Sequence, residues 1–248
     1  MMTLSQTTEL AGFFRIDRFT VFREYLQLVF LSYLYRQRQT DKVYFKGGTA
    51  IHLLFDSPRF SEDLDFSTVL PAADIDRLIK ETETEMRREF PEARISLWHK
   101  GEQGTRFRLI YKSVDFKYPM AIRIDVSFEK PLKLQVSPLV TKFPMTFFPV
   151  VSHLAAEEIL AEKIRALLAR GKGRDVFDLW FLLGKKTAVN KGLISKKIDR
   201  KIFLPELERK IEQFPDKKLK LDLDQFLPAP MRKITDLKQR VGILLPKV

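Results

Sequence analysis

The sequence predicts an α/β protein in two lobes, a small mixed sheet flanked by helices followed by a lobe made of helices. Strand-like alternation and helical periodicity are interleaved up to about residue 150, and beyond it the pattern is almost entirely helical. The 248 residues can bury a sizeable core, and a hydrophobic content of 45% is ordinary for a globular chain. We therefore expect a core lobe over residues 1–150 and a helical, basic lobe over residues 151–248.

The elements of the first lobe follow from periodicity and from proline placement. Apolar residues recur at helical spacing over Arg18–Gln37. A second helix is expected over residues 72–90, beginning after Pro71 and ending before Pro91. Alternating residues predict strands at Val43–Phe45, Asp63–Phe66, Ile95–His99, Thr105–Tyr111 and Met120–Phe128.

The second lobe reads as a series of helices separated by Gly171, Gly184 and Pro215. The expected helices cover about residues 153–169, 173–184, 191–201, 205–213 and 233–243. The apolar run Leu26–Tyr35 is too short to cross a bilayer, and the N-terminus lacks a signal-peptide pattern. We expect a cytoplasmic protein with no membrane partner.

The composition excludes several chemistries and favours a polyanionic partner. The chain has no cysteine, which excludes disulfides, thiolate metal sites and cysteine catalysis. The net charge is +12, and residues 153–248 hold 22 Lys and Arg against 13 Asp and Glu. Such a surplus favours binding to nucleic acid, although lysine-rich helices can also simply present solvated faces. The densest basic cluster is Lys196, Lys197, Arg200 and Lys201.

The segment from residue 44 to residue 67 carries the most informative pattern. A short strand runs into Gly47-Gly48-Thr49, which opens a helix whose N-terminal amides and dipole suit an anion. Asp63 and Asp65 follow on one face of a second strand. Two carboxylates held together repel unless a cation lies between them, and Mg²⁺ binds carboxylate oxygens together with substrate phosphates. This arrangement is typical of a nucleotidyltransferase.

Four ordered motifs resemble the AbiEii/AbiGii-type abortive-infection toxin family of polymerase-β-like nucleotidyltransferases. The resemblance covers about residues 20–185. Its motifs are Lys46–Ala50 with Arg59–Phe66, Arg123–Val126, Glu158–Lys163 and Arg174–Leu179. It implies that the first lobe is the polymerase-β-like nucleotidyltransferase core. It also implies a toxin with two Mg²⁺ (or Mn²⁺) ions, an NTP substrate, an RNA acceptor such as the 3′ end of tRNA, and a separate antitoxin chain.

The resemblance and the local pattern together give each candidate residue a role. Asp125 lies on the polar side of a strand whose other side carries Ile122, Ile124, Val126 and Phe128, and in polymerase-β-like enzymes a carboxylate there completes the metal site and assists the base. The metal ligands are thus Asp63, Asp65 and Asp125. The nucleotide-binding residues are Lys46, Gly47, Gly48, Thr49, Arg59, Ser61 and Lys163.

Lys163 and Asp178 are charged residues at positions where apolar ones are expected. Lys163 falls on the apolar stripe of its helix, and Asp178 has mostly apolar neighbours. A buried charge is costly unless it is paired. Related toxins use a lysine and an aspartate from these motifs, so we expect a catalytic pair with Lys163 facing the phosphates. The structural alternative is an ion pair, either Lys163–Asp178 or Arg174–Asp178.

Two other functions fit parts of the pattern. One is a nucleotidyltransferase that modifies a small molecule or a protein side chain, although a basic lobe does not favour a cationic antibiotic. The other is a non-enzymatic nucleic-acid-binding protein with a decayed site. The presence of all three candidate carboxylates argues against decay.

Overall fold

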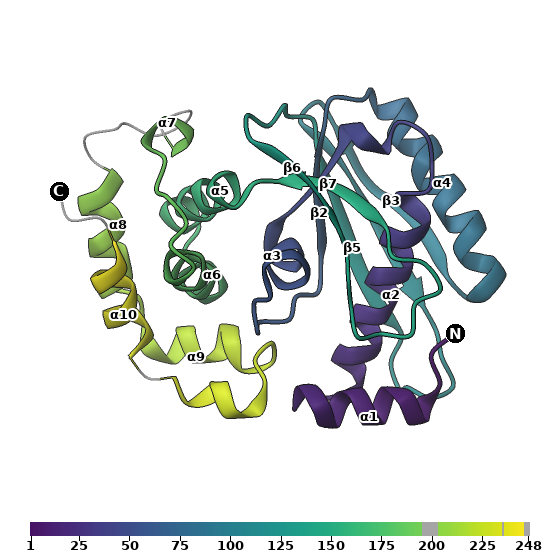
Figure 1. The fold of residues 1–248 in the computed structure, drawn as a ribbon, viewed down its shortest axis with the longest axis horizontal. Helices are drawn as coiled ribbons and strands as arrows, with labels where there is room; N and C mark the ends of the chain where they lie inside the picture. The colour runs from purple at the N-terminus through teal and green to yellow at the C-terminus, as the bar shows by residue number, and fades with distance from the viewer. Residues whose placement is uncertain (195–202, 235, 246–248) are drawn as a thin grey trace. The chain divides into compact units, whose positions relative to one another are not determined.

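The computed structural model describes residues 1–194, 203–234 and 236–245, and Figure 1 shows its elements. The described chain separates into two compact units. Unit 1 comprises Met1–Asp56 and Phe60–His153, whereas unit 2 comprises Ser57–Arg59 and the described residues from Leu154 onward. The three residues Ser57–Arg59 therefore interrupt unit 1 in sequence but pack within unit 2.

Unit 1 is built on a mixed sheet whose strand order is β3-β4-β5-β2-β1-β7-β6. The neighbours β2 and β5 run parallel, as do β1 and β7. The pairs β1–β2, β3–β4 and β4–β5 are antiparallel. The strands are β1 (Val43–Lys46), β2 (Leu64–Thr68), β3 (Arg94–Gly101), β4 (Gly104–Tyr111), β5 (Met120–Ser127), β6 (Leu134–Pro138) and β7 (Val150–Leu154).

Helices cover the sheet of unit 1, and the burial of β5 shows which face is apolar. Ile122 and Ile124 are buried on one face of β5. The alternating residues Arg123 and Asp125 are half-buried on the other face, as the sequence pattern predicted. The ring of Phe30 from the first long helix contacts Phe66 of β2. The helices are α1 (Leu4–Phe14), α2 (Arg18–Leu34), α3 (Gly47–Phe55) and α4 (Ala72–Glu89); α2 and α4 lie on one side of the sheet and α3 on the other (Figure 1).

Unit 2 is helical, with α6 packed against α5, α9 and α10. Phe177 and Leu179 of α6 are fully buried at the centre of this unit. Its helices are α5 (Ala156–Ala169), α6 (Gly173–Gly184), α7 (Lys191–Ile194), α8 (Phe203–Glu212), α9 (Asp216–Asp224) and α10 (Leu237–Leu244). Within the part of the chain that the structure describes, none of the helices is long and apolar enough to cross a membrane.

The predicted α/β fold with a mixed sheet is confirmed, and several element boundaries need correction. Asp63 lies immediately before β2 rather than within it, and His153 belongs to β7 rather than to a helix. The helix expected over 191–201 is described only as α7, since residues 195–202 lie outside the described part of the chain, as does the basic cluster at Lys196–Lys201.

Two α-helices, α1 and α9, were not predicted from the sequence. A local signal existed for α1, because the Thr3 and Gln6 side chains form a capping box at its start. The helix α9 follows Pro215 and buries Leu219 and Leu223, one turn apart. Its remaining residues are mostly charged, so its apolar stripe is too narrow to stand out in the sequence.

Candidate active site

A row of charged side chains crosses the polar face of the sheet in unit 1. In register, Arg106 of β4 is paired with Asp125 of β5, Asp125 with Asp65 of β2, and Asp65 with Lys46 of β1. Residues paired across neighbouring strands point to the same face of the sheet. The row therefore places two carboxylates side by side and flanks them with one cation at each end.

The Asp65 carboxylate lies directly against the turn that opens α3. Gly47 has φ +79°, and a Cβ built on it would lie 2.1 Å from Oδ2 of Asp65. Glycine is required here by both the backbone conformation and the contact. Lys46 is the N-cap of α3 and makes no capping hydrogen bond through its side chain. The predicted anion-binding turn and the predicted metal carboxylate are thus immediate neighbours.

Thr49, the last residue of the Gly47-Gly48-Thr49 turn, helps to hold the loop before β2 in place. The Thr49 hydroxyl donates a hydrogen bond to the carbonyl oxygen of Asp63, and Thr49 is buried. The backbone carbonyl of Ser61 accepts a hydrogen bond from Gln27 at 3.2 Å. These bonds fix the segment between α3 and β2. The expected contacts of Thr49 and Ser61 with the nucleotide stay predictions.

Asp63 is held by an arginine of the neighbouring strand. The Arg123 Nε lies 2.9 Å from Asp63 Oδ1, and the Arg123 Nη2 donates to the other carboxylate oxygen. The hydrogen bonds from Arg123 to Asp63 raise the pKa of the arginine, against the lowering effect of its burial. Both oxygens of Asp63 are therefore engaged by a fixed guanidinium.

Asp125 has an oxygen that is buried and has no hydrogen bond. Its Oδ1 lies 3.1 Å from Nε of Arg106, close enough for an ion pair, but the two groups are not aligned for a hydrogen bond. Burial raises the pKa of the Asp125 carboxyl, and the opposing charges of Arg106 and Arg123 only partly offset this effect. A buried acceptor without a donor is costly, and it marks a place where a ligand would be stabilising.

These residues fit a divalent cation in part. Mg²⁺ is commonly held by one or two carboxylates, with substrate phosphates and water completing its shell. The neighbouring carboxylates of Asp65 and Asp125, one with an unsatisfied oxygen, meet that need. Across residues 1–194, 203–234 and 236–245, however, no three His, Asp or Glu side chains converge as a ready ligand group. Arg123 engages both carboxylate oxygens of Asp63, and the role of Asp63, Asp65 and Asp125 as metal ligands stays a prediction.

A second cluster of predicted site residues lies inside unit 2. Asp178 is fully buried, and its two oxygens accept from Arg59 Nε at 2.7 Å and Nη2 at 2.9 Å. The Lys163 Nζ lies 2.7 Å from the same carboxylate. Burial by itself raises the pKa of Asp178, but Arg59 and Lys163 more than offset it, so this pKa lies below its ordinary value.

The ion pair between Lys163 and Asp178 is present, and Arg59 is a further partner that the sequence reading missed. Arg59 is 119 residues away from Asp178, and its side chain is only 2% exposed. Its guanidinium is committed to Asp178, whereas we expected it to reach phosphates. That expected contact stays a prediction. No local pattern could indicate the pairing, because it depends on the packing of Ser57–Arg59 into unit 2.

The network continues along α6 through a second buried carboxylate. Asp175 is 1% exposed, and its Oδ1 lies 3.6 Å from Nζ of Lys163. Arg170 at the end of α5 lies 3.3 Å from the same carboxylate. Lys163 is thus held between two acidic residues one turn apart on α6, with Arg170 on the outer side.

The predicted site residues form two groups. The group in unit 1 consists of Lys46, Gly47, Asp65 and Asp125, with Gly48, Thr49 and Asp63 beside them. Arg59, Lys163 and Asp178 come together in unit 2. Arg106, at the end of the row, was not singled out by any motif. Only the strand register reveals that it faces Asp125.

Comparisons with known proteins identify the family and the fold. Residues 29–246 match the family described as "Nucleotidyl transferase AbiEii toxin, Type IV TA system". No curated protein sequence matches the chain closely enough to serve as a relative. The structure of JHP933 from Helicobacter pylori has a TM-score of 0.61 at 20% identity, covering 92% of this chain and 90% of that one. The nucleotidyltransferase toxin MenT4 from Mycobacterium tuberculosis has a TM-score of 0.66 at 16% identity, covering 98% and 88%.

Proposed function

The chain belongs to the AbiEii family of nucleotidyltransferase toxins, and from this premise we propose that it transfers a nucleotide from an NTP to a hydroxyl of RNA, such as the 3′ end of tRNA. In this reaction the acceptor oxygen forms a bond to the α-phosphorus. The bond from the α-phosphorus to the bridging oxygen of the β-phosphate breaks, and pyrophosphate leaves. The acceptor hydroxyl loses its proton.

The observation that carries this proposal is the contact between Asp65 and the Gly47 turn, within a row that also holds Asp125. The amides at the start of α3 suit the triphosphate, because a helix N-terminus offers donors and a positive dipole end. Lys46, whose side chain caps no amide, lies at the same edge of the turn. Gly48 and Thr49 supply the following amides.

Asp65 and Asp125 are the residues that would hold Mg²⁺, with Asp63 joining them if a ligand displaces Arg123. When bound, the metal neutralises phosphate charge and polarises the reacting phosphoryl group. We also assign to Asp125 the role of taking the proton of the acceptor hydroxyl, and its buried Oδ1 without a hydrogen bond supports this role.

Lys163 and Asp178 enter the proposal as a held cation and the group that positions it. The carboxylates of Asp178 and Asp175 hold the ammonium group of Lys163, whose side chain remains 11% exposed. A lysine fixed in this way can present its charge to a phosphate group with little loss of side-chain entropy. Arg59 shares Asp178 and stabilises the arrangement.

The surplus of positive charge in the second half of the chain supports RNA as the acceptor. The family also suggests an antitoxin, which we expect to be a separate chain.

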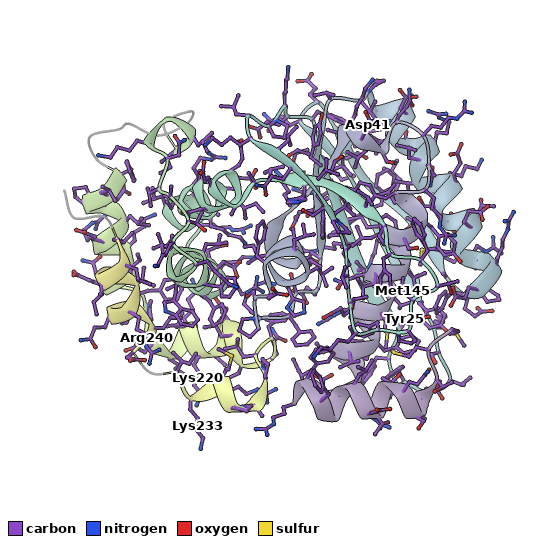
Figure 2. The ribbon with its side chains drawn as sticks, in the orientation of Figure 1. Tyr25, Asp41, Met145, Lys220, Lys233 and Arg240 are labelled. Atoms are coloured by element: carbon purple, nitrogen blue, oxygen red, sulfur yellow. The ribbon has the colours of Figure 1, made fainter. Side chains whose placement is uncertain are left out.

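The test is to incubate the protein with each labelled NTP and total RNA and to locate the label. Asp65→Asn is expected to reduce transfer by about 100-fold or more, the size of loss when one electrostatic group of an active site is removed. Asp41→Asn makes the same chemical change at an exposed position of unit 1 and should leave transfer unchanged (Figure 2). Label that enters a protein or a small molecule instead of RNA would contradict the acceptor. A folded Asp65→Asn protein with full activity would contradict the site.

A further inference from the structure

We propose that unit 2 carries a second, separate binding site, a basic pocket for a phosphodiester group of the RNA backbone. The inference rests on the proposed RNA acceptor and adds a contact that positions it. The pocket has a volume of about 260 Å³ and lies at the junction of α5 and α6 beside α9. The residues used below are Arg170, Lys172, Arg174, Lys218, Asp222 and Phe226.

The lining carries four cations and a single carboxylate. The cations come from three segments, the end of α5 with the turn after it, the first turn of α6, and α9. Their convergence is therefore a product of the fold, not of one lysine-rich helix with a solvated face. Guanidinium and ammonium groups around one hollow favour a phosphate, because arginine binds it through paired donors and lysine as a point charge.

Packing already orients three of the four cations. Arg170 lies 3.3 Å from the buried carboxylate of Asp175, and Arg174 lies 5.0 Å from the centre of the Phe226 ring. The ammonium group of Lys218 lies 3.2 Å from the carbonyl oxygen of Gly171. Side chains that are ordered before binding lose less entropy when a ligand arrives, so this pocket is prepared for an anion.

The one carboxylate of the pocket has a structural partner. Asp222 accepts a hydrogen bond from the backbone N–H of Gly173 at 2.7 Å. A Cβ on Gly173 would lie 2.9 Å from Cβ of Asp222, so the glycine allows α9 to approach the start of α6. Asp222 thereby joins two helices and forms a wall of the pocket, while the cations around it outnumber it.

The size and polarity of the pocket select the kind of ligand. Sites for drug-sized molecules span about 300–1,000 Å³ and are mainly apolar. This pocket is smaller and its lining is mainly charged, and the ring of Phe226 is buried, so it is not available to stack on a base. A phosphate with part of its sugar fits these limits better than a whole nucleotide. Because Asp175 contacts both Arg170 and Lys163, the pocket also adjoins the buried cluster of Lys163 and Asp178 within unit 2.

The test compares two charge reversals on the same helix, Lys218→Glu in the pocket and Lys220→Glu outside it. Figure 2 labels Lys220. Binding of a short fluorescent single-stranded RNA to the full chain, without NTP, is measured by anisotropy over a range of salt concentrations. One lost phosphate contact lowers the slope of log affinity against log salt by about 0.7 for a single strand. We expect that change in Lys218→Glu and in Lys172→Glu, and an unchanged slope in Lys220→Glu. Equal effects of the Lys218 and Lys220 reversals on the slope, or no effect of either, would contradict the proposal that the pocket binds an RNA phosphodiester group.

Two further measurements separate the possible failures. Inorganic phosphate is titrated into the wild-type protein in the same assay; if phosphate alone saturates the pocket and Lys218→Glu binds RNA normally, the ligand is a free phosphate, which contradicts the proposal. Thermal unfolding of each variant identifies losses caused by misfolding. Because the binding assay contains no NTP, wild-type protein that binds RNA through Lys218 but labels no RNA would contradict the proposed acceptor and leave the pocket standing.

Discussion

The two charged clusters of this protein differ in the charges that surround their carboxylates. In unit 1, Asp65 and Asp125 lie side by side on neighbouring strands, and burial raises the pKa of Asp125. In unit 2, the fully buried Asp178 is surrounded by Arg59 and Lys163, which hold its pKa below the ordinary value. Like charges held together are destabilising until a cation arrives, whereas opposite charges buried together are already satisfied. We therefore expect the first cluster to gain more from a bound cation than the second, whose buried carboxylate is already paired.

The largest expected effect on stability comes from breaking the cluster in unit 2. Asp178→Ala leaves the side chains of Arg59 and Lys163, which are 2% and 11% exposed, without their shared carboxylate. Removing one partner of a buried pair typically costs about 3–5 kcal/mol. Urea unfolding measures the loss. Asp65→Ala is the same truncation in unit 1, where the carboxylate is only half-buried and lies beside Asp125, so the loss of stability should be smaller. A similar loss in both variants would contradict the comparison.

Lys163→Met should cost less stability than Asp178→Ala, because Asp178 keeps both hydrogen bonds from Arg59. We expect about 1.5–3 kcal/mol, the range for a hydrogen bond between charged groups. If Lys163 also presents its charge to the nucleotide, NTP affinity should fall even where the protein remains folded. Melting temperature and NTP binding, measured on the same sample, distinguish the two roles. Reduced stability with normal NTP binding would make the lysine purely structural.

Gly47→Ala tests the junction between the turn and the acidic row. A side chain at φ +79° costs about 1–2 kcal/mol, and the added Cβ must also displace the Asp65 carboxylate. We therefore expect the loss of transfer activity to be larger than the loss of folded protein can explain. Gly12→Ala is the control, because Gly12 lies in α1 with nothing within 4 Å of its Cβ position, and alanine there should stabilise by about 0.5–1 kcal/mol. Normal transfer by Gly47→Ala would contradict the contact.

The smallest expected effect is a change of stability with pH, which appears only in the acidic range. The folded pKa of Asp178 lies below its unfolded value of about 3.9, so its contribution is present above that pH and is lost as pH falls through the folded pKa. Asp125 has the opposite sign, since its raised pKa gives stability that is present at low pH and is lost as pH rises. Urea unfolding between neutral and acidic pH should give a flatter acid limb in Asp178→Asn and not in Asp125→Asn. The same acid limb in both would contradict the opposite signs.

Much of unit 1 could be read from the sequence because its signals are local. The strand before Gly47, the helix after it and the alternation of β5 each depend on residues a few positions apart. The same holds for α2, α4 and α6. The boundaries of the elements were predicted less accurately. His153 was expected to begin a helix but belongs to β7, because it pairs with Phe45, a residue far away in the sequence. The helix α9 was missed because only two of its residues are buried.

The sequence by itself determined that carboxylates and a glycine turn occupy one strand–helix–strand unit, because spacing along the chain sets which side chains share a face. It also marked Lys163 and Asp178 as charges in apolar surroundings, which must be paired if buried. Only the tertiary structure decided the partners. Strand register places Arg106 against Asp125, and Arg123 donates hydrogen bonds to Asp63 just before β2. The packing of Ser57–Arg59 into unit 2 brings Arg59 to Asp178. Such contacts are decided by which surfaces bury together, and no short-range pattern in the chain encodes them.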